Sequence, residues 1–214
     1  WKLTEHDVAE FIRGRFERLN LVAPDGPIVA IDAHASDPHY EPSRDNSAIV
    51  RKNSLLLIDL WAVSAEPGSV FGDITWTGFT GEPSPKHEDV FAAVAEARDT
   101  AVSFMGDAFA QGRELEGWEV DRVAREVIAK SGYADYFVHR LGHSIGFEVH
   151  SNGVNLDDWE THDTRVLIPG VAVSVEPGIY LPEFGIRSEI NVFFGEHGPE
   201  VTGEIQREIV KINF

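Results

Sequence analysis

The chain has 214 residues, 43% of them hydrophobic and 10% aromatic, a composition that supports one packed domain and argues against intrinsic disorder. Its net charge of −18 argues strongly against nucleic acid or an anionic membrane surface as a partner. Cysteine is absent, which excludes disulfides and thiolate metal sites and leads us to expect a cytoplasmic location, and no apolar run approaches the roughly 20 residues that span a bilayer.

The first half of the chain predicts a helix, a strand and a hairpin. Thr4, followed by acidic residues, marks a helix start, and apolar residues then recur at helical spacing. Residues 27–32 suit a short strand, and a loop rich in His, Pro and Ser follows. Residues 55–63 and 70–79 are strand-like and enclose turn sequence at 66–69, so they predict a β-hairpin.

The second half predicts two helices and then many short strands. Ser84-Pro85 caps a long helix that reaches to about Gly112. A second helix, residues 118–131, stops at Gly132, a residue that suits the position after a helix end. Short strands and glycine-rich turns continue to Phe214. This order predicts an α+β fold with an antiparallel sheet and helices on one face.

Two aspartates occupy strand positions that usually carry apolar side chains. Asp59 lies in Leu-Leu-Leu-Ile-Asp-Leu-Trp and Asp73 in Val-Phe-Gly-Asp-Ile-Thr, on opposing arms of the predicted hairpin. Pairing of the arms could bring them together, and two buried carboxylates need a cation or shifted pKa values. The alternative is an edge hairpin with both side chains facing water.

Further candidate ligands follow in the second half. His139, His143 and His150 lie within twelve residues, Glu176 ends an apolar strand before a Pro-Gly turn, and Glu189 lies inside a predicted strand. Carboxylates and an imidazole in this combination suit two hard or borderline divalent cations with bridging carboxylates. The sequence has no phosphate-binding glycine loop and no nucleophile elbow to support a competing scheme.

Taken in order, these segments resemble the motifs of the pita-bread metallopeptidases, which include methionine aminopeptidase, Xaa-Pro aminopeptidase and prolidase. The resemblance covers nearly the whole chain. It implies a pita-bread fold, a curved antiparallel sheet with helices on its outer face and pseudo-twofold halves. It also implies one catalytic domain over residues 1–214, without the N-terminal domain typical of the proline-directed branch. The matching segments are Pro38-His39-Tyr40, Ile58-Asp59, Asp73-Ile74-Thr75, Gly142-His143-Ser144-Ile145-Gly146, Glu176-Pro177-Gly178 and Arg187-Ser188-Glu189.

The same resemblance implies a metal centre with two divalent ions per chain. The oxygen-rich ligand set favours Mn²⁺, and Co²⁺, Zn²⁺ or Fe²⁺ could also bind. A hydroxide held between the metals would attack the scissile carbonyl. The implied ligands are Asp59, Asp73, His143, Glu176 and Glu189, of which Asp73 and Glu189 would bridge both ions.

The resemblance also assigns residues around the reacting bond. Glu176 would pass a proton from water to the leaving amine, and His150 would stabilise the oxyanion. His39 would steer the substrate, while His139 and Arg187 would line the pocket on the leaving-group side. The expected substrate-binding residues are therefore His39, His139, His150 and Arg187. The expected catalytic residues are Glu176, His150 and His39.

The leading interpretation is an aminopeptidase that hydrolyses the N-terminal Xaa-Pro bond of peptides. A prolidase-like dipeptidase and a methionine aminopeptidase are the alternatives within the enzyme class. A metal-free pita-bread peptide-binding module is the alternative of another class, but such relatives replace ligands and this chain replaces none. Peptide substrates are the expected partners, and a homodimer remains open.

Two tryptophans depart from the family pattern and bear on the substrate pocket. Trp61 stands where a small residue is usual, and Trp76 replaces an arginine that often follows Asp-Ile-Thr. A prolyl ring would need apolar surface, which Trp61, Phe147 or Tyr180 could supply.

Overall fold

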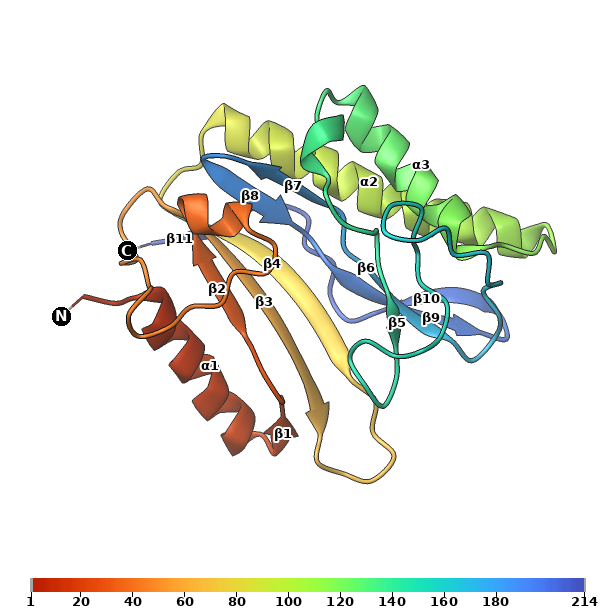
Figure 1. The fold of residues 1–214 in the computed structure, drawn as a ribbon, viewed down its shortest axis with the longest axis horizontal. Helices are drawn as coiled ribbons and strands as arrows, with labels where there is room; N and C mark the ends of the chain where they lie inside the picture. Colours follow the sequence, from red (N-terminus) through yellow and green to blue (C-terminus); the bar gives the residue numbers. More distant parts are fainter. Residues whose placement is uncertain (1, 214) are drawn as a thin grey trace.

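The first half of the chain forms a helix packed on a small sheet (Figure 1). A computed structural model describes residues 2–213 of the protein. The predicted helix start is confirmed, because the Thr4 hydroxyl accepts from the Asp7 N–H at 3.2 Å and the Asp7 carboxylate accepts from the Thr4 N–H at 2.9 Å. The elements are α1 (Glu5–Arg18), β1 (Leu21–Val22), β2 (Ile28–Ile31), η1 (Asp32–Ser36), β3 (Leu55–Ser64) and β4 (Gly72–Thr80).

The second half begins with the two predicted helices and continues as short strands. Gly132 has a φ of +85°, the left-handed conformation that ends the second helix as its sequence predicts. No helix in residues 2–213 is long and apolar enough to cross a bilayer. The elements are α2 (Pro85–Ala110), α3 (Gly117–Lys130), η2 (Ala134–Tyr136), β5 (Ser144–Ile145), β6 (Ala172–Val175), β7 (Gly178–Leu181), β8 (Phe184–Arg187), β9 (Ile190–Gly195), β10 (Gly198–Thr202) and β11 (Val210–Ile212).

The strands form two main sheets and one hairpin. One sheet has the order β1-β3-β4-β11 with β2 also paired to β3, the other has the order β10-β9-β6-β5, and β7 pairs with β8. Every pair is antiparallel, as predicted, except β11 with β4, which is parallel. Because β11 reaches β4 after the whole second half and not through a hairpin, its direction is free of the constraint that a tight turn imposes.

The two main sheets meet where β4 passes β9. The Glu189 N–H donates to the Thr75 carbonyl at 3.0 Å, and the Asn191 side-chain oxygen accepts from the Asp73 N–H at 3.0 Å. These contacts join the sheets into one surface that runs through the centre of the molecule. The α+β class is confirmed, and residues from both halves line the junction.

Alternation along the strands gives each sheet a helix-covered face. Val29 and Ile31 of β2 pack in a cluster with Ala9 of α1, whereas their neighbours Ile28 and Ala30 belong to the large central core. That core also takes the buried side of α2 and α3, so the helices cover the sheets from outside (Figure 1). The uncovered surface at the sheet junction is left for polar side chains.

Candidate metal centre and active site

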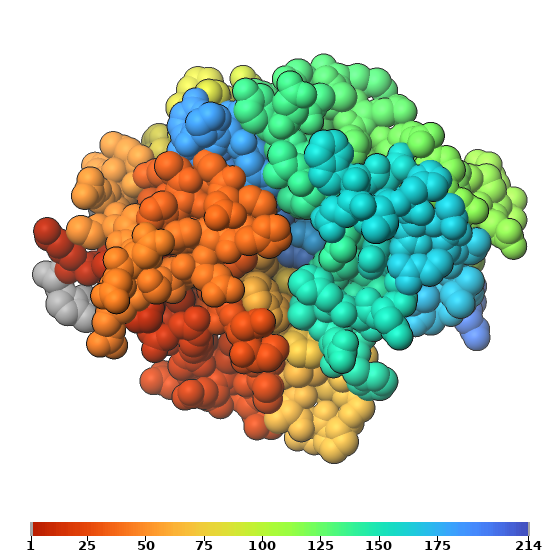
Figure 2. All heavy atoms as spheres, viewed as in Figure 1, coloured from red at the N-terminus to blue at the C-terminus, as the bar shows by residue number. Residues whose placement is uncertain are grey.

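All nine site residues selected from the sequence line one cavity of about 270 Å³ at the sheet junction. In Figure 2 its mouth is the hollow between the orange segment after β2 and the teal segment after β5, with blue second-half residues at the bottom. The nine residues are His39, Asp59, Asp73, His139, His143, His150, Glu176, Arg187 and Glu189.

The β3–β4 hairpin supplies the two aspartates. Asp59 pairs in register with Thr75, and Asp73 pairs with Trp61. The aspartates are therefore diagonal neighbours on the same face, two residues out of register, and their side chains are within reach of each other. Both are buried, so the alternative of an edge hairpin with water-facing aspartates is wrong.

The other carboxylates and the imidazole come from strand ends of the second sheet. Glu176 directly follows β6, as predicted, and its N–H donates to the Leu141 carbonyl at 2.8 Å. Glu189 was expected inside a strand and lies one residue before β9, bound through its N–H to β4. His143 precedes β5, and its carbonyl accepts from the Ser174 N–H at 2.9 Å. Backbone hydrogen bonds thus fix all three residues.

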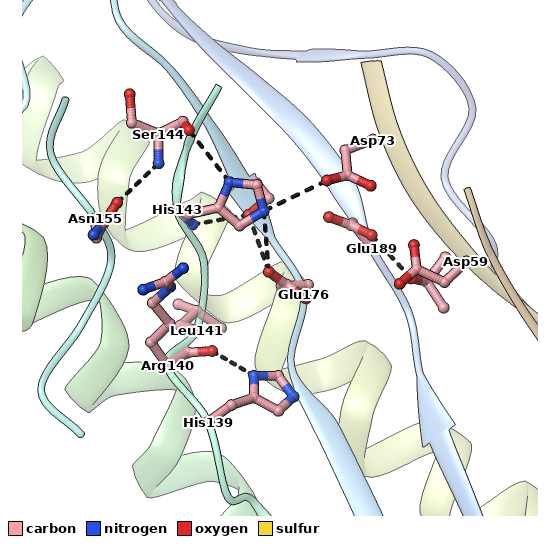
Figure 3. Close-up of polar contacts among 12 residues, drawn as sticks. Asp59, Asp73, His139, Arg140, Leu141, His143, Ser144, Asn155, Glu176 and Glu189 are labelled. Carbon is pink, nitrogen blue, oxygen red and sulfur yellow. Dashed lines mark hydrogen bonds and ion pairs between the residues drawn. The ribbon is translucent and has the colours of Figure 1, made fainter. Parts of the chain in front are cut away.

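The side chains of these residues converge in the cavity (Figure 3). Ligand atoms of Asp73, His143 and Glu189 all lie within 4.8 Å of one another, and all three residues are buried. His143 Nε2 lies 3.5 Å from Asp73 Oδ2 and 3.5 Å from Glu176 Oε1. His143 Nδ1 lies 3.2 Å from the Ser144 carbonyl, and a hydrogen bond there leaves Nε2 facing the acids.

Two carboxylates in the cavity have one oxygen held and one oxygen free. Arg187 holds Asp59 Oδ2, and the Thr75 hydroxyl donates to Glu189 Oε2 at 2.9 Å. Within residues 2–213, the remaining oxygens, Asp59 Oδ1 and Glu189 Oε1, are buried without any hydrogen-bond partner. Buried acceptors are costly unless satisfied, so these atoms fit the place of a bound cation.

The electrostatics of the cavity show a surplus of negative charge. Burial raises the pKa of Glu176 to about 7 against the opposing effects of His143 and Arg187, and burial together with the neighbouring acids raises that of Glu189 well above its usual range. Burial, opposed by Arg187 and reinforced by Asp73, raises the pKa of Asp59. Burial alone would lower the pKa of His143, but Asp73 and Glu176 outweigh it and raise that pKa. Without a metal, these buried groups therefore tend to hold protons. A bound cation would neutralise the same negative charge.

Arg187 links Asp59 to His139 through the Tyr180 hydroxyl. The guanidinium donates to the Tyr180 hydroxyl oxygen at 2.8 Å and to the Thr75 hydroxyl at 3.1 Å. His139 Nδ1 can only donate to the Arg140 carbonyl, 2.7 Å away, so its Nε2 accepts from Tyr180 at 2.7 Å. Burial and the charge of Arg187 lower the pKa of His139 to about 3, so this ring is neutral.

His150 and His39 stand at the mouth of the cavity, and both are exposed. The His150 ring is edge-on to His143, with ring centroids 4.3 Å apart. Partial burial and the neighbouring His143 lower the pKa of His150. A neutral imidazole at this position can donate one hydrogen bond to a substrate oxygen.

Several residues in or beside the cavity were given no role from the sequence. Thr75, which hydrogen-bonds Glu189 and Arg187 without lining the cavity itself, could have been found, because it lies two residues after Asp73 and therefore on the same strand face. Asp25, which accepts from Trp61 Nε1 at 2.8 Å, and Glu160, which pairs with Arg140 at 3.3 Å, lie on loops without a periodic signal.

The tryptophans and the other aromatic candidates take different places. Trp61 lines the cavity, whereas Trp76 pairs with Ile58 and faces the α1 side of the sheet. Phe147 is 75% exposed and does not line the cavity, and Tyr180 is buried behind His139. Of the three apolar surfaces considered for a prolyl ring, only Trp61 borders the cavity in the described residues.

Comparison with known proteins places the chain in a family. The sequence profile of metallopeptidase family M24 matches residues 2–196. An Xaa-Pro dipeptidase of Pyrococcus furiosus is 34% identical over 187 residues, which cover 86% of this chain and 48% of the relative. The chain therefore spans about half the length of that relative.

Solved structures agree with the sequence comparison. A dipeptidase of Mycobacterium ulcerans superimposes with a TM-score of 0.86 at 30% identity, covering 100% of this chain and 54% of the other. An X-Pro aminopeptidase of Thermotoga maritima gives 0.84 at 29%, covering 99% and 56%. The predicted pita-bread fold and proline-directed branch are confirmed. The chain belongs to metallopeptidase family M24.

Proposed function

We propose that this chain is the catalytic part of a metallopeptidase that hydrolyses the N-terminal Xaa-Pro bond of peptides. One observation carries the proposal: Asp59 and Glu189 each keep one buried oxygen without a partner in a cavity where Asp73, His143 and Glu189 converge within 4.8 Å. Their second oxygens are held by Arg187 and Thr75, so the free oxygens are already oriented.

We assign two divalent cations to this cavity, held by Asp59, Asp73, His143, Glu176 and Glu189. Four carboxylates and one imidazole form an oxygen-rich set, which favours Mn²⁺ among the transition metals. When bound, the cations would supply Lewis-acid polarisation of the scissile carbonyl and make hydroxide available near neutral pH.

The chain's own residues handle protons and the carbonyl oxygen. Glu176, with a pKa of about 7 and 3.5 Å from His143, is suited to accept a proton from water and return it to the leaving amine. His150 is neutral at the cavity mouth and is suited to donate to the oxyanion. His39, on the opposite rim, is suited to orient the peptide.

A prolyl peptide bond has no N–H, so its recognition must rest on shape and on the carbonyl. Trp61 offers an aromatic wall held in place by Asp25. His139 is neutral and locked between Arg140 and Tyr180, so it presents a fixed ring edge beside the metal cluster. Both features suit a tertiary amide with a ring, whose nitrogen has no N–H and so needs no acceptor from the protein.

The length of the peptide depends on what meets its carboxylate. Of the Lys and Arg side chains in residues 2–213, only Arg140 and Arg187 line the cavity. Arg187 is committed to Asp59, Tyr180 and Thr75, and Arg140 is paired with Glu160. This favours peptides that continue beyond proline. A prolidase-like dipeptidase is the second candidate, supported by the relative named Xaa-Pro dipeptidase.

A peptide panel tests the proposal. Initial rates are measured for Xaa-Pro-Xaa, Xaa-Pro and Met-Ala-Ser after loading with Mn²⁺, Co²⁺, Zn²⁺ or Fe²⁺. We expect the fastest cleavage at the Xaa–Pro bond of the tripeptide and loss of cleavage with a chelator. Release of Met from Met-Ala-Ser with the prolyl peptides untouched would refute the substrate assignment, and faster hydrolysis of Xaa-Pro would select the dipeptidase.

A further inference from the structure

A completely buried carboxylate lies outside the cavity, at the first turn of α1. Glu5 Oε1 accepts from the Ile31 N–H at 2.7 Å, and Oε2 accepts from the Ala48 N–H at 2.6 Å and from the Tyr40 hydroxyl at 2.7 Å. His34 Nδ1 lies 3.0 Å from both oxygens. Within residues 2–213 no Lys or Arg forms an ion pair with it, so these hydrogen bonds and the contact with His34 hold it.

These partners belong to separate segments that converge on the Glu5 carboxylate. Ile31 ends β2, His34 lies in η1, and Tyr40 and Ala48 lie near the two ends of the irregular segment 37–49, the rim loop, between η1 and β3. In Figure 1 this loop, in orange, crosses from η1 toward the N-terminal end of α1. One carboxylate therefore ties the helix, the strand and both ends of the rim loop together.

The rim loop carries His39 to the mouth of the cavity. Pro38, His39 and Glu41 line the cavity, whereas Tyr40, in the middle of this run, points inward and is 7% exposed. The Tyr40 ring lies 4.4 Å from the His34 ring, centroid to centroid, and its hydroxyl reaches Glu5. Because adjacent residues share a peptide unit, anchoring Tyr40 restricts where His39 can lie.

We propose that Glu5 is a positioning residue that sets the place of His39 over the cavity through Tyr40 and the rim loop. The proposal rests on the proposed function for the role of His39, but the anchoring itself can be measured without a substrate. Glu5→Gln keeps the size of the side chain while leaving one acceptor oxygen and adding two N–H donors that face other donors. The Tyr40 end of the rim loop should then loosen, whereas the far end keeps the backbone bonds of Ala48 with Glu5 and of Val50 with Leu3.

Trypsin gives a readout of the loop. Arg44 is exposed at its tip, where Ser43 and Asn46 exchange backbone hydrogen bonds of 3.2 Å. We expect cleavage after Arg44 to become about tenfold faster in Glu5→Gln, because local opening controls proteolysis of a folded chain. Cleavage after Lys130, on α3 far along the chain, should not change. Tyr40→Phe should give a smaller increase of the same kind and serves as the second variant if Glu5→Gln fails to fold.

Peptide kinetics test whether the anchor acts through His39. In Glu5→Gln, KM for Xaa-Pro-Xaa should rise by about tenfold with kcat within about twofold, the pattern of a lost binding contact. In a His39→Ala background, Glu5→Gln should cause no further rise, because the group it positions is absent. Val29→Ala, which loosens the α1 packing without touching the carboxylate, is the matched control and should leave KM and Arg44 cleavage unchanged.

Each result decides the proposal. Cleavage after Arg44 that is no faster than in Val29→Ala would overturn the anchoring. An equal rise in KM with and without His39 would overturn the positioning role. If the unmodified chain hydrolysed no peptide, the proposed function would fail, while the trypsin comparison would still decide whether Glu5 anchors the rim loop.

Discussion

Acidification is expected to release divalent metal from the cavity, because protons and cations compete for the same carboxylates. Burial raises the pKa of Glu176 from 4.5 to about 7. The difference, roughly 2.5 units, corresponds to about 3 kcal/mol by which the metal-free site disfavours the ionised carboxylate relative to water. From this group alone, the apparent affinity should fall about 25-fold between roughly pH 7.5 and 5.5. The raised pKa of Glu189 makes the fall steeper.

Calorimetric titration of Mn²⁺ into the metal-free protein measures this effect. Titrations in buffers of different ionisation enthalpy count the protons released on binding. Glu176→Gln should release about one proton fewer and flatten the pH dependence. Glu160→Gln, a carboxylate on the cavity wall outside the metal cluster, is the control and should behave as the unmodified protein. An affinity independent of pH would refute the reasoning.

The same group gives the metal-free protein a pH-dependent stability. The folded-state pKa of Glu176 is raised, so the folded chain binds this proton more tightly than the unfolded chain does. Its stabilising contribution is fully present below about pH 4.5 and is lost as the pH rises through about 7. The Tm difference between the unmodified protein and Glu176→Gln should change over this window, and saturating Mn²⁺ should remove that change.

Four substitutions test the ligand set, the oxyanion donor and the packing at Gly185. Asp73→Ala and Glu189→Ala should each lose both metals by elemental analysis, because each is proposed to bridge; full occupancy in either would refute the ligand assignment. His150→Ala should lower kcat by about 10²–10³-fold with unchanged metal content, the usual cost of one oxyanion donor; near-normal kcat with a lower Tm would indicate a structural histidine. Gly185→Ala should destabilise the fold by at least about 3 kcal/mol in denaturant unfolding, because its Cβ would lie 1.8 Å from the Ala35 carbonyl oxygen; unchanged stability would contradict this packing.

Several helices, strands and cavity residues could be predicted from short-range patterns in the sequence. The cavity aspartates were found because a charged residue stands in an otherwise apolar strand. Asp59 and Asp73 interrupt apolar strands, and such a conflict marks a functional position. Glu176 ends a strand at a Pro-Gly turn, which fixes its place before any tertiary contact is known. The helix starts at Thr4 and Ser84 followed from capping chemistry, which is local in sequence.

Features that depend on distant contacts were not predictable. Asp59 has one hydrogen-bonded oxygen and one free oxygen because Arg187, which is 128 residues away in the chain, binds only Oδ2. The parallel pairing of β11 depends on the path of the whole second half. Glu5 reads in sequence as an ordinary first-turn acid of a helix, and only the folded chain shows that its carboxylate holds the rim loop.

Two cations are proposed to lie among Asp59, Asp73, His143, Glu176 and Glu189, and an anomalous difference map from Mn²⁺-soaked crystals tests this most directly. We predict two peaks in the cavity, about 3.5–4 Å apart as in other two-metal sites, with Asp73 and Glu189 between them. Asp59 should contact one ion through Oδ1 while Arg187 still holds Oδ2. A single peak, or no peak in this cavity at saturating Mn²⁺, would contradict the account.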